Sequence, residues 1–356
     1  MKSIEYRQLA NILALFLIVQ LSGLLIAFYL ITPSMVVASP QPAGGYEVVY
    51  YFLYIILAAV LMTFLFRIYH GNAIFTIIEA IVIASASFYL FLIVLSSALP
   101  QSYGDYAVAL SVAAAVLLVI AKNKWPGLRN LAAVIASIGV GVVLGSYFGF
   151  FAAYAFMAFI AAYDYVAVFV TRHMIALGRE SVNRNLAFMI GSYDVEVVPK
   201  GYLKGSDLSD AKKTISASKV SNPEIKKLIK SGTYPVPSFS ALGTGDLAIP
   251  LMLAVSAYST YFRYFVSLLI VVGAAAGLVF AMYVSKKYKV ALPAIPPLFA
   301  FISISLLAGF AILGVHDVWV YPLLAAAGAA ILALIFFSAK RQSREGDAVR
   351  LVRTSA

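Results

Sequence analysis

Two aspartates lie inside apolar stretches of this 356-residue chain, where a charged side chain is costly. Asp164 follows Ala161-Ala162-Tyr163, and Asp246 follows Leu242-Gly243-Thr244-Gly245. A charge at the centre of a bilayer costs roughly 2.5 to 3.5 kcal/mol on insertion scales, so such residues point to function. Two carboxyls that face each other in a poorly solvated site cannot both ionise, and they share one proton. The ionised member can activate a water to attack an amide while the protonated member polarises the carbonyl, and either aspartate could take either role.

Other catalytic groups are less well placed for chemistry inside a membrane. The histidines, His70, His173 and His316, lie at the edges of apolar segments or in loops, and no His-Glu-x-x-His motif occurs. The absence of cysteine excludes thiol nucleophiles and cysteine-bound zinc. We therefore expect neither a metal nor another cofactor. Glu79 is the one further acid well inside an apolar segment, and we interpret it as a structural residue that reaches the interface or pairs with Arg67.

The elements that must position the aspartates are predicted to be transmembrane helices. Hydrophobic residues make up 63% of the chain and charged residues 12%, and the mean hydropathy is +0.94. This composition indicates an all-α polytopic membrane protein. Apolar segments of spanning length predict ten helices. They lie at about 9–31, 48–66, 73–97, 104–121, 130–148, 150–171, 238–258, 262–284, 292–314 and 318–338.

The basic residues give an independent test of this count, because they should gather on alternate loops. The 172–237 loop carries eleven Lys and Arg, five more follow residue 338, and the opposite set of loops contains only Arg263. Both termini and the 172–237 loop are therefore predicted to be cytoplasmic. This pattern also accounts for the net charge of +11, so we expect no nucleic-acid partner.

The predicted topology brings the two aspartates to one depth. One helix enters the 172–237 loop and the next leaves it, and each aspartate is eight residues from the loop, or roughly 12 Å along its helix. We divide the chain into a six-helix part at 1–171, the loop at 172–237, a three-helix part at 238–314, and an extra helix with a basic tail at 315–356. Within the loop, the alternation over 193–198 predicts a short strand, with a solvated linker as the alternative.

Glycine and proline mark the sequence around the candidate site. Gly243 and Gly245 remove side chains where another backbone could approach, and Pro250 removes a helix hydrogen bond one turn after Asp246. Three prolines in 291–297 argue against regular helix there, although prolines in the first turn of a plain helix are the alternative. Such irregular backbone could pair with an extended peptide. Two Gly-x-x-x-Gly pairs, at 141–145 and 273–277, are expected to pack helices together.

Three separated motifs occur in an order that resembles the presenilin and signal peptide peptidase family of intramembrane aspartyl proteases. They are Tyr163-Asp164, Leu242-Gly243-Thr244-Gly245-Asp246 and Pro293-Ala294-Ile295. The wider matches are closer to presenilin, and the chain resembles a prokaryotic or archaeal homologue over about residues 1–314. The third motif has Ile295 where the family has leucine, a near-isosteric change that we expect to be tolerated.

The resemblance implies a nine-helix bundle with Asp164 and Asp246 as the catalytic pair. Tyr163, the residues before Asp246 and the Pro293-Ala294-Ile295 motif would shape the site and seat the substrate, which in the family is a single transmembrane helix. The apolar segment at 318–338 departs from the family as a tenth helix.

Three alternative readings remain at this stage. A proton- or ion-coupled transporter also uses intramembrane aspartates, but it predicts related halves and a polar path across the bilayer, and the sequence shows neither. A prepilin-type peptidase shares a Gly-x-Gly-Asp element but lacks the other two motifs. A member of the family that has lost activity would keep the same motifs. The sequence names neither a natural substrate nor an oligomeric state.

Overall fold

The structure, a computed structural model, describes most of the predicted helices together with one small sheet. The described residues are 2–30, 45–69, 71, 73–171, 189–199, 233–261, 263–288, 292–313, 326, 328–338 and 340–341. Within them the chain divides into two compact units, one formed by 1–14 and 191–242 and the other by 15–190 and 243–356. The two aspartates both belong to the second unit.

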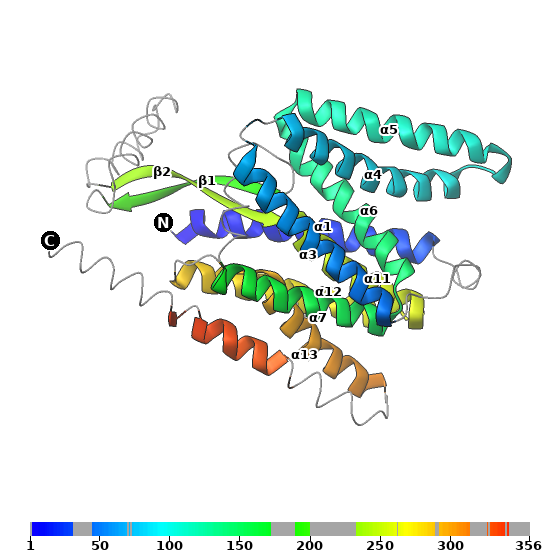
Figure 1. Cartoon of the computed structure of the whole chain (residues 1–356). Helices are drawn as coiled ribbons and strands as arrows, with labels where there is room; N and C mark the ends of the chain where they lie inside the picture. The colour runs from blue at the N-terminus through cyan, green and yellow to red at the C-terminus, as the bar shows by residue number, and fades with distance from the viewer. Residues whose placement is uncertain are drawn as a thin grey trace. The chain divides into compact units, whose positions relative to one another are not determined.

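Each of the ten expected apolar segments overlaps a described helix. The long helices are α1 (Lys2–Leu30), α3 (Gly45–Ile68), α4 (Ala73–Ala98), α5 (Gly104–Lys124), α6 (Arg129–Tyr147), α7 (Phe150–Tyr165), α11 (Thr244–Tyr261), α12 (Tyr264–Tyr288) and α13 (Ile295–Leu313) (Figure 1). The tenth segment is helical over Gly328–Ser338, and most of 318–327 lies outside the described residues. Six of the described helices are long and apolar enough to cross a membrane.

Most residues of the two-stranded sheet belong to the first unit, and in this sheet β1 (Met189–Pro199) pairs with β2 (Thr233–Gly243) (Figure 1). The strand predicted at 193–198 is therefore confirmed, and it is longer than expected. The helix predicted from residue 238 is wrong in its first six residues, because α11 begins at Thr244. Hydropathy alone cannot separate a short apolar strand from a helix, and pairing with β1 gives the backbone of this segment its hydrogen-bond partners.

In the second unit, α11 is the most enclosed helix. Its side chains from Leu247 to Ser259 are buried, with Ile249 only partly so. It packs against α6, α7 and α12, while α13 packs against α7 and α12. Large apolar side chains are exposed elsewhere, as on α3, where Leu57, Leu61 and Phe64 are all more than half exposed. An apolar outer surface around an enclosed central helix suits a bundle that faces lipid.

Two glycine pairs let the site-bearing helices approach their neighbours, as expected. A Cβ at Gly145 of α6 would lie 2.6 Å from the carbonyl oxygen of Met252 in α11. A Cβ at Gly277 of α12 would lie 2.7 Å from the Cα of Leu298 in α13. Real Cβ atoms do not come so close to backbone, so these contacts require glycine. The predicted packing role of the 141–145 and 273–277 motifs is confirmed.

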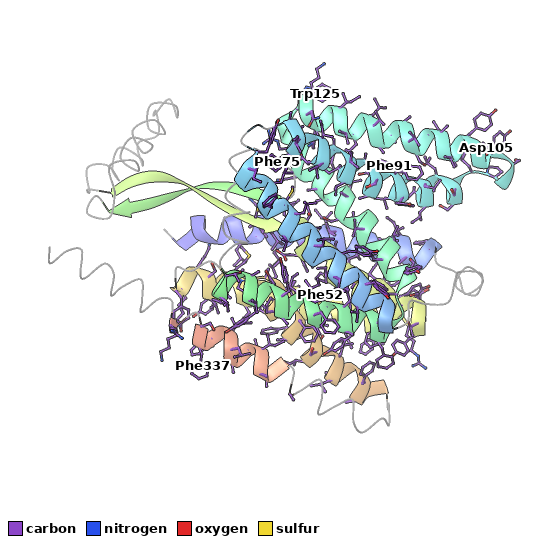
Figure 2. The ribbon with its side chains drawn as sticks, in the orientation of Figure 1. Phe52, Phe75, Phe91, Asp105, Trp125 and Phe337 are labelled. Atoms are coloured by element: carbon purple, nitrogen blue, oxygen red, sulfur yellow. The ribbon has the colours of Figure 1, made fainter. Side chains whose placement is uncertain are left out.

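A second packing group joins α4, α5 and α6. Its buried centre contains Ile83, Ala86, Ala132 and Ala136. Helix α5 runs along this group from Asp105 in its first turn to Trp125 just past its last residue, and Figure 2 shows these two side chains at its opposite ends. This region also contains the third membrane-embedded acid, Glu79.

Candidate active site

Asp164 lies near the end of α7, where the helix changes its winding. The next five residues, Val166–Val170, form a π-helix, in which the N–H of Thr171 donates to the carbonyl of Val166 at 3.0 Å. Single π turns inside α-helices are rare and are frequent at functional sites. The Asp164 side chain is only 3% exposed, so its carboxylate must obtain its partners from protein.

One of those partners is the start of α13. The backbone N–H of Ile295 donates to Oδ2 of Asp164 at 3.4 Å in a buried hydrogen bond. Ile295 is the first residue of α13, and Pro296 and Pro297, which follow it, have no N–H. Ile295 is therefore the only residue among the first three of the helix that can donate to an anion there. The positive end of the α13 dipole adds to this interaction.

Residues 292–297, which contain the third motif, only partly match the expectation of irregular backbone. Leu292, Pro293 and Ala294 are not helical, as predicted, but Ile295, Pro296 and Pro297 form the first turn of α13. The first turn tolerates proline because its N–H groups have no partner within the helix. Pro293 is buried and Ala294 is partly buried. The motif places one backbone donor on Asp164.

Asp246 is the third residue of α11 and lies in its first turn. Its Oδ2 accepts the N–H of Gly243 at 3.2 Å, which is the arrangement of a carboxylate at a helix N-terminus. Asp164 and Asp246 are close enough for their charges to interact. In the part of the chain that the structure describes, neither carboxylate pairs with a Lys or Arg. Backbone N–H groups and helix dipoles take the place of a cation.

The two glycines before Asp246 have different surroundings. A Cβ at Gly243 would lie 3.2 Å from Oδ2 of Asp246, so a side chain there would crowd the acid. Gly245 is exposed, and a Cβ there would meet no described atom within 4 Å. Among the described residues, nothing thus fills the space beside Gly245.

The start of α11 is also held by polar residues that the sequence analysis missed. Gln20 of α1 is fully buried, and its Nε2 donates to the carbonyl of Leu247 at 2.8 Å. Ser137 of α6 donates to the carbonyl of Thr244 at 3.3 Å. Gln20 is a polar residue inside an apolar segment, which is the same signal that identified the aspartates. Its partner is 227 positions away, so the pairing itself follows only from the fold.

The other predicted site residues lie beside the aspartates in sequence. Tyr163 is partly buried and close enough to Asp164 for their side chains to interact electrostatically. Leu242 is the residue before Gly243 in β2 and belongs to the first unit. Among the described residues, no group of three or more His, Asp or Glu could hold a metal ion.

Glu79 has a different environment from the two aspartates. It is buried on α4, and its Oε1 lies 2.7 Å from Nζ of Lys122, which is also buried. The expectation that Glu79 is structural fits this ion pair. Its described cation is Lys122 in the last turn of α5, and the side chain of Arg67, the expected partner, lies outside the described residues.

The fold and the site together define a helical membrane protein with two aspartates whose charges interact. The chain matches the sequence model described as signal-peptide peptidase, presenilin aspartyl protease over residues 13–316. The chain therefore belongs to this family of aspartyl proteases, and it is a multi-pass membrane protein. The family match gives no support to the transporter alternative.

Solved structures of presenilin family proteases have a fold similar to that of this chain. One is a presenilin family intramembrane aspartate protease in space group C222, with 18% identity and a TM-score of 0.55, covering 85% of this chain and 99% of the other. A second, in space group P2, has 20% identity and a TM-score of 0.52, covering 85% and 97%. Comparison with curated proteins gave no match. The predicted helical, presenilin-like fold is confirmed.

Proposed function

We propose that Asp164 and Asp246 are the catalytic pair with which this intramembrane aspartyl protease cuts peptide bonds inside transmembrane segments. One observation carries the proposal. Oδ2 of Asp164 accepts the N–H of Ile295 while its charge interacts with Asp246, so three motifs spread over more than 130 positions meet at one acid.

The chemistry requires one ionised and one protonated carboxyl. The ionised aspartate takes a proton from a water, whose oxygen attacks the peptide carbonyl, and the protonated aspartate donates its proton to the carbonyl oxygen. The tetrahedral intermediate then collapses, the C–N bond breaks, and the leaving nitrogen receives a proton from the pair. Two carboxyls that interact in a buried site suit this exchange, since one proton can serve both.

The surrounding residues have positioning roles in this proposal. The Ile295 and Gly243 N–H groups orient one oxygen of each carboxylate. Pro293 and Ala294 shape the approach to Asp164, and Thr244 and Gly245 offer the peptide a surface without bulky side chains. Tyr163 would line the route of the substrate beside Asp164, and Leu242 would help to shape the site by setting the backbone position of Gly243, the next residue.

The substrates we propose are single transmembrane helices, including remnants of signal peptides. A helix must unwind before its peptide bonds become accessible, because its carbonyls are engaged in the helix. We further propose that 172–237 is a cytoplasmic loop between the parts at 1–171 and 238–314, and that both termini are cytoplasmic. The alternation of basic loops supports this orientation.

The test is cleavage of an artificial single-span substrate by the purified chain in lipid vesicles. Mass spectrometry of the products should place the cut within the span. Asp164→Asn and Asp246→Asn should each abolish cutting, because asparagine keeps the size of the side chain but cannot exchange a proton. If the wild-type chain cuts nothing, and the same two substitutions instead abolish a proton flux across the vesicle membrane, the proposal is wrong.

A further inference from the structure

The helix Gly328–Ser338 lies outside residues 13–316, which match the family, yet it contacts helices that build the site. At its first residue, a Cβ on Gly328 would lie 3.1 Å from the carbonyl oxygen of Ala300 and 3.5 Å from Cγ1 of Ile304, both on α13. The helix therefore begins against the helix whose first N–H binds Asp164.

At its other end the same helix reaches α7. The hydroxyl groups of Ser338 and Tyr165 lie 2.6 Å apart in a partly buried hydrogen bond. Tyr165 is the residue after Asp164 and the last residue of α7 before the π-helix Val166–Val170. The Ser338–Tyr165 hydrogen bond thus lies where the α-helix changes to a π-helix, one residue after Asp164.

The remaining contacts show that the helix is seated along one side. Ile335 is fully buried, and the ring of Phe336 lies 6.1 Å from the ring of Tyr288, the last residue of α12. Phe337 is 70% exposed and points away from the other helices in Figure 2. The helix therefore touches α7, α12 and α13, and its opposite side is apolar and open.

We propose that Ser338 is a positioning residue which, through Tyr165, fixes the end of α7 and with it the Asp164 carboxylate. The inference rests on the proposed function of Asp164. Adjacent Cα atoms are about 3.8 Å apart, so a shift of Tyr165 moves Asp164 relative to the N–H of Ile295. A displacement of about 1 Å at a catalytic group can cost up to about 100-fold in rate. The extra helix thus gives this chain a support for its active site that lies outside the family match.

The test compares full-length variants by their cleavage of the artificial single-span substrate in vesicles. Ser338→Ala and Tyr165→Phe break the same bond from its two ends, and each should lower kcat about tenfold with KM unchanged. The double variant should be no slower than either single variant. Ser338→Thr keeps the hydroxyl group, so its kcat should stay at the wild-type value.

Tyr154→Phe is the matched control. Tyr154 is also on α7, and its hydroxyl pairs with that of Ser303 on α13 at 2.7 Å. It lies ten residues before Asp164, or roughly 15 Å along the helix. Its loss should lower the thermal midpoint as much as the loss of the Ser338 bond does, while kcat stays at the wild-type value.

The outcomes separate this inference from the proposed function. If the wild type cuts and Ser338→Ala lowers only the thermal midpoint, as Tyr154→Phe does, then Ser338 is a packing residue and the inference is wrong. If Ser338→Ala does not fold, Tyr165→Phe takes its place: a lower thermal midpoint with an unchanged kcat would again show that the inference is wrong. If the wild type cuts nothing, the proposed function fails, and this inference fails with it.

Discussion

Two regions of the molecule hold carboxylates among the helices, and the carboxylates of the two regions have different partners. Between α4 and α5, Glu79 forms an ion pair with Lys122 at 2.7 Å, with both side chains almost fully buried. Near the ends of α7 and α11, Asp164 and Asp246 lie close enough for their charges to interact, and the described hydrogen-bond donors to each are backbone N–H groups. Lys122 offsets the charge of Glu79, whereas each aspartate has the other carboxyl near enough for their charges to interact, so that one proton can serve both. The comparison teaches that burial alone does not identify a catalytic acid; the nature of its partner does.

The strongest test of the comparison is the double variant of the two aspartates. Asp164→Asn and Asp246→Asn should each lower kcat/KM by at least about 1,000-fold, which lies within the range for loss of a general acid or base. The double variant should be no worse than either single variant, because residues that act as a unit are not additive. Cleavage rates of the three purified variants check this. Losses that multiply in the double variant would show that the two acids act independently.

Breaking the ion pair should affect stability rather than chemistry. Glu79→Gln leaves Lys122 charged and buried, which is expected to cost about 3 to 5 kcal/mol of folding free energy. The thermal midpoint in detergent should fall, while kcat per folded molecule stays near the wild-type value. The control is Glu79→Gln combined with Lys122→Met, which removes the stranded charge and should recover most of the loss. A combined variant as unstable as Glu79→Gln alone would contradict this account of the pair.

A steric change can reach Asp164 without altering any charge. Gly277→Ala would place a methyl 2.7 Å from the Leu298 backbone, so α13 must shift, at about 1 to 3 kcal/mol. Because α13 donates the Ile295 N–H to Asp164, cleavage should slow as well, and paired rate and melting measurements check both effects.

Gly245→Ala is the matched change at an open position. It meets no described atom within 4 Å, so stability should stay the same or rise by up to about 1 kcal/mol, while KM should increase if a peptide approaches there. If Gly245→Ala destabilised the protein and Gly277→Ala did not, the packing described for both glycines would be wrong.

The smallest expected effect concerns Gln20. Gln20→Leu removes the hydrogen bond to the Leu247 carbonyl, and a bond of this kind contributes about 1 kcal/mol. Because Leu247 follows Asp246, kcat should fall severalfold. Ser305→Ala is the control, since it removes a serine bond to the carbonyl of Leu269 that joins α12 and α13. Equal kcat values for the two variants would show that Gln20 only stabilises the bundle.

Sequence patterns identified the two aspartates as candidate site residues because a charge inside an apolar segment is rare enough to carry meaning on its own. The same reasoning found Glu79 but could not assign its partner, since Lys122 reaches it only through the packing of α4 on α5. The start of α11 was misplaced because a short apolar strand and the beginning of a helix have the same hydropathy. Contacts between distant segments, such as that of Ser338 with Tyr165, depend on how helices pack, and no local pattern encodes them.

The most direct test measures cleavage of one artificial single-span substrate by Asp164→Asn and Glu79→Gln, with rates expressed per folded molecule. Our account predicts that Asp164→Asn folds, because asparagine can still accept the Ile295 N–H, and that it cuts nothing. It predicts that Glu79→Gln is less stable and cuts at the wild-type rate once folded. An active Asp164→Asn, or a folded but inactive Glu79→Gln, would contradict the assignment of chemistry to the aspartate pair.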